Sequence, residues 1–296
     1  MSETTQESAL TPVPILGTGQ IITNVLALFI KRFPKILILC LPAGLALGLV
    51  FYLGIRWIDS GFIGAPSFIP WWLMNPFTVF SAAIGLAMGL SAGPLAEAYH
   101  RYYTTRRVPL GACMKAIIRR PLAALIMGVI VAGATLLPFA ALSWATSARL
   151  GLFVGSVALV IGMYVLGFWG LALPAISRDR MGFGGFGRSK NLSKDYRWRI
   201  AGTCFVLFFA ALLAGGLVGA GLVLLGQLIL AELLGIQGLG FFGTNTDLFE
   251  VLMLIDFCLS FTIIVALIVL GLAAIRARMV EIKEPPDIED MVAVFD

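Results

Sequence analysis

Few residues in this chain belong to the types that carry chemistry. Its 296 residues include one histidine, His100, and four cysteines, at positions 40, 113, 204 and 258. A structural zinc site needs roughly four Cys or His ligands at short spacings, whereas these cysteines lie far apart. No Ser-His-Asp set, metal-ligand cluster or pair of carboxylates can be assembled on one side of a bilayer. The sequence therefore predicts a protein that is not an enzyme and binds no cofactor or metal.

One acidic residue stands inside an apolar stretch. Asp256 is enclosed by the apolar residues 252–255 and 257–259. An ionisable side chain in hydrocarbon is unfavourable, and it marks a candidate site for a proton or a cation. The same carboxylate could equally accept hydrogen bonds from Ser, Thr or backbone donors where two helices pack. The sequence leaves both interpretations open.

The composition indicates whether water or lipid surrounds most of the side chains. Of the residues, 59% are hydrophobic and 12% are charged, and the mean hydropathy is +0.97. Soluble domains carry roughly 25% charged and about 45–50% apolar residues. This balance excludes a soluble enzyme, a disordered protein and a free nucleic-acid binder. It predicts an all-α integral membrane protein.

Six segments are long and apolar enough to cross a bilayer, which takes about 20 residues. They cover residues 34–57, 76–98, 121–145, 150–176, 200–234 and 249–275. We therefore expect a six-span membrane domain over residues 15–279. It is flanked by a disordered tail at 1–14 and by an acidic C-terminal tail at 280–296.

The basic residues predict the orientation of these spans. Of the 21 Lys and Arg residues, only Arg56 and Arg149 lie in the first, third and fifth links between spans. The others precede span one, fill the second and fourth links, or follow span six. Positively charged loops stay in the cytoplasm. Both termini are therefore expected to be cytoplasmic.

A similar block precedes each odd-numbered span. Residues 20–31 and 110–119 place apolar residues at helical spacing opposite polar ones, and residues 182–199 follow a more polar version of the pattern. Such segments are typical of amphipathic helices that lie in the headgroup plane. The expected unit is an interfacial helix followed by a two-span hairpin, used three times.

These blocks and the links around them carry most of the basic side chains. A cytoplasmic face of this charge attracts anionic lipid by about 1 kcal/mol per basic residue near the surface. Alternatively, the blocks are amphipathic linkers that fill space under the bundle. The residues expected to face lipid or a partner are Arg106, Arg107, Lys115, Arg119, Arg120, Arg188, Lys190, Lys194, Arg197 and Arg199.

Small residues and prolines recur inside the predicted spans. Gly85, Gly89 and Gly93 form one helical stripe, and the pairs 44/48 and 215/219 have the same spacing. Such stripes allow close packing of helices in lipid, within one chain or between copies. The prolines at 42, 94, 138 and 174 are expected to kink or end their helices.

Residues 173–199 carry a family pattern. An apolar span ends in Leu-Pro-Ala-Ile (173–176), and Arg-Asp-Arg-Met-Gly-Phe (178–183), Arg-Ser (188–189), Leu-Ser (192–193) and Arg-Trp-Arg (197–199) follow. This pattern resembles the signature of a bacterial family of six-span inner-membrane proteins. The family includes the membrane domain attached to some glycerophosphoryl diester phosphodiesterases and the YciC-like uncharacterised proteins. The chain departs from the family pattern between the middle spans, where Pro138 lacks the Gly-Ile that commonly follows the proline.

The resemblance implies a multi-pass protein of the bacterial inner membrane. It implies no catalytic activity, because the chain has no soluble phosphodiesterase domain. The favoured hypothesis is a scaffold or accessory subunit whose basic cytoplasmic face contacts anionic phospholipids or a membrane protein complex, with no nucleic acid as partner. The alternative is a small transporter or channel that uses Asp256 and the proline-kinked spans.

Overall fold

The structure is a computed structural model that describes residues 17–59, 76–118, 121–138, 148–179, 182–234 and 246–284. The described residues are helical, with no strand among them, which confirms the all-α prediction. The helices are α1 Thr18–Lys31, α2 Phe33–Asp59, α3 Pro76–Thr105, α4 Leu110–Ile118, α5 Pro121–Leu136, α6 Ala148–Trp169, α7 Ala172–Asp179, α8 Gly185–Ser193, α9 Arg197–Leu234 and α10 Thr246–Lys283.

Four helical segments are long and apolar enough to cross a membrane. They lie in α2, in α6 with α7, in α9 and in α10. A fifth is counted if α4 and α5, which meet at 74°, form one broken span. The remaining long helix, α3, is less hydrophobic because glycines, serines and Pro94 interrupt its apolar residues. These helices are compatible with a multi-pass membrane protein, and the expected six spans stay a prediction.

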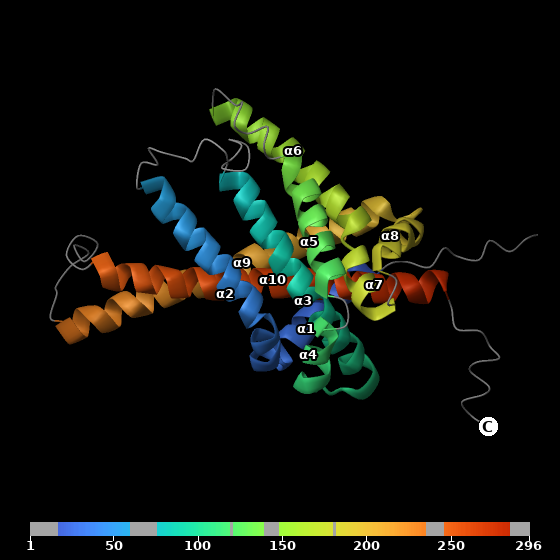
Figure 1. Ribbon diagram of the computed structural model, residues 1–296, viewed down its shortest axis with the longest axis horizontal. Coiled ribbons are helices and arrows are strands. Elements are labelled where there is room, and N and C mark those ends of the chain that lie inside the picture. Colours follow the sequence, from blue (N-terminus) through green and yellow to red (C-terminus); the bar gives the residue numbers. More distant parts are fainter. Residues whose placement is uncertain are drawn as a thin grey trace, which may run out of the picture.

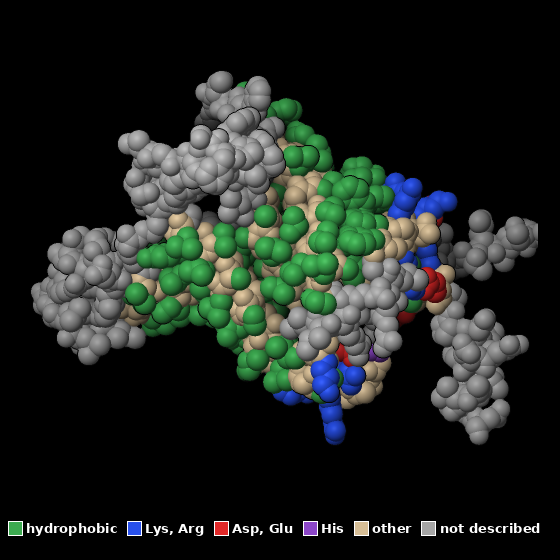
Figure 2. Space-filling view, in the orientation of Figure 1, with side chains coloured by type: hydrophobic (Ala, Val, Ile, Leu, Met, Phe, Trp, Pro, Cys, Tyr) green, Lys and Arg blue, Asp and Glu red, His purple; other side chains and the backbone are tan. Residues whose placement is uncertain are grey.

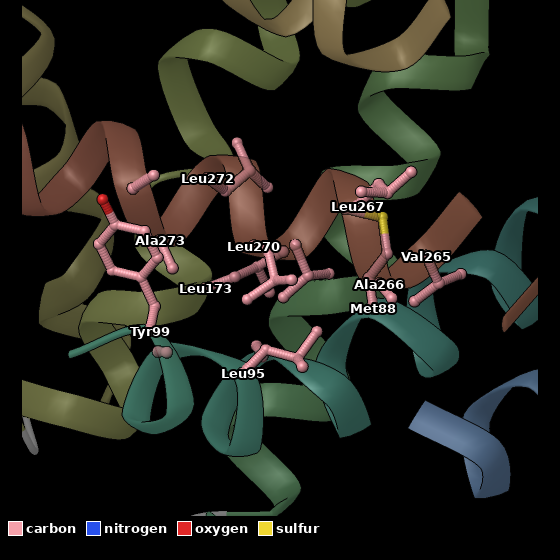
Figure 3. Close-up of a cluster of buried hydrophobic side chains, with 14 of the residues drawn as sticks. Met88, Leu95, Tyr99, Leu173, Val265, Ala266, Leu267, Leu270, Leu272 and Ala273 are labelled. Carbon is pink, nitrogen blue, oxygen red and sulfur yellow. The ribbon is translucent and has the colours of Figure 1, made fainter. Parts of the chain in front are cut away.

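Helix α10 lies at the centre of the molecule (Figure 1). In its apolar segment 72% of the residues are buried, against 22% in the segment of α9. It packs against α2, α3 and α9 and against the shorter helices α1, α7 and α8. Leu267 and Leu270 of α10 lie among Met88 and Leu95 of α3 and Leu173 of α7 (Figure 3). The last turn of α10 includes residues 280–283, which the sequence analysis assigned to the tail.

Glycines let the long helices approach one another closely. A Cβ atom at Gly85 of α3 would lie 2.5 Å from Cα of Val129 in α5, and one at Gly48 of α2 would lie 2.9 Å from Cα of Cys258 in α10. Real Cβ atoms do not come this near to backbone atoms, so no larger residue fits. The predicted glycine stripes at 85/89 and 44/48 therefore pack within the chain.

Pro174 explains the break between α6 and α7. In a continuous helix its ring would clash with the carbonyl group of Gly170, four residues earlier. The helix instead ends at Trp169, and the amide of Leu173 donates to the Gly170 carbonyl at 3.2 Å. The turn places α7 in the bundle, where Leu171, Leu173 and Ile176 are fully buried.

Short helices precede the long helices α2, α5 and α9, as the sequence analysis expects. The apolar face of α1 points into the bundle, because Ile21, Val25, Leu28 and Phe29 are buried in the core. The equivalence of the three units stays a prediction. Figure 2 shows an apolar flank over the long helices and two groups of basic side chains at the end that carries the short helices.

Candidate functional site

The predicted basic residues fall into three groups in the structure. Arg119 and Arg120 lie outside the described residues. Arg106, Arg188 and Arg197 have partners within the chain, described below. The side chains of the third group are exposed, and no hydrogen bond or ion pair joins them to other described residues; they are Arg107, Lys115, Lys190, Lys194 and Arg199.

The partnered arginines join elements of the fold. The guanidinium of Arg106 lies over the rings of Tyr102 and Tyr103, at 5.6 and 5.8 Å from their centroids. Arg197 lies 4.9 Å from the ring centroid of Phe168. Such cation–π contacts hold the charged groups beside the protein surface. These two arginines therefore have a structural role that the sequence analysis did not assign to them.

Arg188 ties α8 to the end of α10. Its guanidinium donates to the Glu284 carboxylate at 2.5 Å. The neighbouring Lys283 donates to the carbonyl oxygens of Lys194 at 2.7 Å and Asn191 at 3.2 Å. These carbonyls lie at the C-terminal end of α8, where a cation is favoured by the helix dipole. The sequence analysis missed Lys283 because its partners lie about 90 residues earlier in the chain.

The turn between α8 and α9 brings two exposed basic side chains next to a pair of aromatic rings. Asp195 has the left-handed φ of 73° that lets the chain reverse within a few residues. The turn leaves Trp198 72% exposed, with its ring tilted at 48° against that of Tyr164 of α6 and 5.0 Å between the centroids. Lys194 and Arg199 flank this aromatic pair, and these four residues line an open hollow of about 560 Å³ together with Asp195, Tyr196 and Arg197. The pairing of Tyr164 with Trp198 has no signal in the sequence, because Tyr164 lies inside an apolar helix.

Two more titratable groups lie at this end of the molecule. Glu97 accepts a hydrogen bond from Arg101 at 2.5 Å, one helical turn away, and this bond raises the pKa of Arg101 above its usual range. In α4, burial raises the pKa of the Cys113 thiol to about 11. Glu97 and Arg101 therefore form an ion pair within α3, and the neutral Cys113 behaves as a small apolar residue.

Asp256 lies where α9 and α10 meet. The hydroxyl of Ser260, one turn further along α10, lies 3.1 Å from the carboxylate and 3.0 Å from the Gly215 carbonyl oxygen of α9. Gly219 leaves room for this contact, because a Cβ there would overlap the carboxylate and lie 2.6 Å from the Ser260 oxygen. Among the described residues no three His, Cys, Asp or Glu side chains are grouped to hold a metal ion. The carboxylate therefore has the surroundings of a helix–helix contact.

The variant Ser260→Ala tests this interpretation. It removes the hydroxyl that Asp256 and the Gly215 carbonyl share, and we expect a loss of about 1 kcal/mol in stability, the usual net value of one such bond. Thermal unfolding in detergent measures the change. Ser156→Ala is the matched control, because the Ser156 hydroxyl is exposed and bonds only within its own helix, to Leu152 at 2.8 Å. Equal melting temperatures for the two variants would contradict the assignment.

No family model, curated protein or solved structure matches the chain. The resemblance of residues 173–199 to the six-span inner-membrane family therefore stays a prediction from the motif.

Proposed function

We propose that this chain is a non-enzymatic, six-span protein of the bacterial inner membrane with both termini in the cytoplasm. In this proposal it acts as a scaffold or accessory subunit whose basic face binds anionic phospholipid or a membrane protein. The long apolar helices support the membrane location. The gathering of Lys and Arg at the end that carries the short helices supports the orientation, because basic segments stay cytoplasmic (Figure 2).

The observation that carries the proposal is the α8–α9 turn. Lys194 and Arg199 are exposed beside the paired rings of Trp198 and Tyr164. Tryptophan and tyrosine prefer the headgroup layer, and Lys and Arg there attract anionic lipid. A phosphate group in the hollow would accept charge-assisted hydrogen bonds from both cations. This combination fits a phospholipid headgroup better than it fits a bare linker.

Neutralising the two cations tests the proposal. We expect Lys194→Gln/Arg199→Gln to weaken phosphatidylglycerol binding by about 2 kcal/mol, or roughly 30-fold, at about 1 kcal/mol per basic residue. The measurement is a titration of detergent-solubilised protein with mixed micelles of phosphatidylglycerol and phosphatidylcholine. Raised salt should weaken binding by the native protein, because the attraction is electrostatic.

Arg149→Gln is the matched control for this experiment. Arg149 is also exposed, but it lies at the opposite end of α6 from the turn. Arg149→Gln should therefore leave phosphatidylglycerol binding unchanged. Equal binding by the double variant and the native protein would overturn the lipid proposal, and a protein partner lost from pull-downs of the same variant would favour a membrane protein as the partner of the basic face.

A further inference from the structure

A partly open apolar cavity lies among the long helices, away from the basic face. Its volume is about 290 Å³, close to the lower end of the range of ligand pockets. Every long helix contributes to its wall: Leu47 of α2, Met88 of α3, Ala132 of α5, Met163 of α6, Phe208 of α9 and Val265 of α10. Met88 and Val265 are visible on neighbouring helices in Figure 3.

The wall offers nothing for a polar ligand or for water. Among its lining residues the polar one is Thr135, whose hydroxyl donates to the Val131 carbonyl of its own helix at 2.7 Å. The remaining lining side chains are aliphatic, aromatic or thioether groups. A water molecule needs two to four polar partners, and apolar cavities of this kind stay dry but accept apolar guests.

The wall continues into the outer apolar surface of the molecule. Leu212 of α9 lines the cavity and is 40% exposed, and its neighbour Leu213 is 64% exposed on the apolar flank. In a membrane, the liquid in contact with this flank is the hydrocarbon of the lipid tails. An unfilled space also forfeits dispersion contacts for all the atoms that line it. A lipid tail is thus the occupant that is both available and chemically matched.

We infer that this cavity binds the acyl chain of a membrane lipid. The wall suits a hydrocarbon segment and carries no group that would recognise a headgroup. This inference goes beyond the proposed function and shares with it only the membrane location, because no lining residue belongs to the α8–α9 turn.

A photoactivatable lipid tests the inference. The probe is phosphatidylcholine with a diazirine at the end of one acyl chain, added to the full chain solubilised in detergent micelles. After illumination, mass spectrometry of peptides should find labels on the cavity residues Met88 and Met163. Excess unlabelled phosphatidylcholine, added at a constant ratio of probe to detergent, should suppress these labels, since a single site saturates, while labels on the outer flank should depend on the probe-to-detergent ratio alone.

The variant Ala132→Phe fills the cavity, because Ala132 is 2% exposed and forms part of the wall. It should lose the saturable labels on Met88 and Met163. Ala220→Phe makes the same change at an exposed position of α9 and should keep them. Lys194→Gln/Arg199→Gln should also keep them, so failure of the headgroup proposal is distinguishable from failure of this one.

Two results would overturn the inference: unchanged saturable labelling in Ala132→Phe, or labels on Met88 and Met163 that never saturate in the native protein. Circular dichroism and gel filtration report whether each variant is folded. If Ala132→Phe does not fold, the smaller Ala132→Leu decides by the same criterion, with a partial loss of saturable label expected.

Discussion

Gly128→Leu is expected to prevent the bundle from assembling. A Cβ at Gly128 of α5 would overlap the Gly85 carbonyl oxygen of α3 and lie 2.9 Å from the Gly89 amide nitrogen. Backbone atoms on a packed helix cannot rotate away as a side chain can. Overpacking usually destabilises by about 1–3 kcal/mol; here we expect at least about 3 kcal/mol, a large part of a typical stability of roughly 5–15 kcal/mol.

The same helix supplies the control. A Cβ at Gly133 of α5 would meet no atom within 4 Å, so Gly133→Leu makes the same substitution as Gly128→Leu without a clash. The measurement is the monodisperse fraction after detergent extraction, followed by thermal unfolding. We expect aggregation or a strongly lowered melting temperature for Gly128→Leu and a near-native profile for Gly133→Leu. Similar profiles for both variants would show that the α3–α5 contact is not tight.

The second prediction with a large expected effect concerns the side of the membrane from which introduced cysteines react with a membrane-impermeant maleimide. In the proposed topology, Arg107→Cys lies in the cytoplasm and Arg149→Cys outside. Both positions are exposed, so access depends on the side of the membrane alone. We expect Arg149→Cys to be labelled in intact cells and Arg107→Cys to be labelled only in inverted vesicles. Labelling of Arg107→Cys in intact cells would overturn the orientation and the cytoplasmic role of the basic face.

The native cysteines should give little background in this experiment. All four are buried, and the thiolate is the form that reacts with maleimide. Because the pKa of Cys113 is raised to about 11, its thiol stays protonated near neutral pH and ionises only in strong alkali. Background labelling should therefore be low at neutral pH and rise as the pH approaches that value. Strong labelling of the native protein at neutral pH would contradict the burial of these residues.

Much of the fold could be predicted from composition and spacing. Long apolar runs specify helices, and the 85/89 and 44/48 glycine pairs indicate which faces pack closely. What the pattern could not specify is which helix each face meets. Gly85 contacts α5, whereas Gly48 contacts α10, some 210 residues later in the chain. Tertiary pairing between uniformly apolar helices depends on shape, which hydropathy does not encode.

The site could be predicted only in outline. The run of basic residues indicates the charged face. The sequence does not show which of these cations have partners: Arg106 and Arg197 lie over aromatic rings, whereas Lys194 and Arg199 are exposed. Asp256 is conspicuous in the sequence, but its contact with Ser260, whose hydroxyl also lies near the Gly215 carbonyl, depends on how α9 meets α10.

The central helix α10 follows, in chain order, the helices α1, α2, α3, α7, α8 and α9 that it packs against. The 49 residues 235–283 separate the end of α9 from the end of α10, and at roughly 5–20 residues per second their translation takes about 2 to 10 seconds. Until then α2, α3 and α9 lack the helix that they share as a neighbour. The bundle can therefore assemble fully only after α10 has been synthesised, and a chain that stops before residue 246 would present uncovered glycine faces to the cell's proteases.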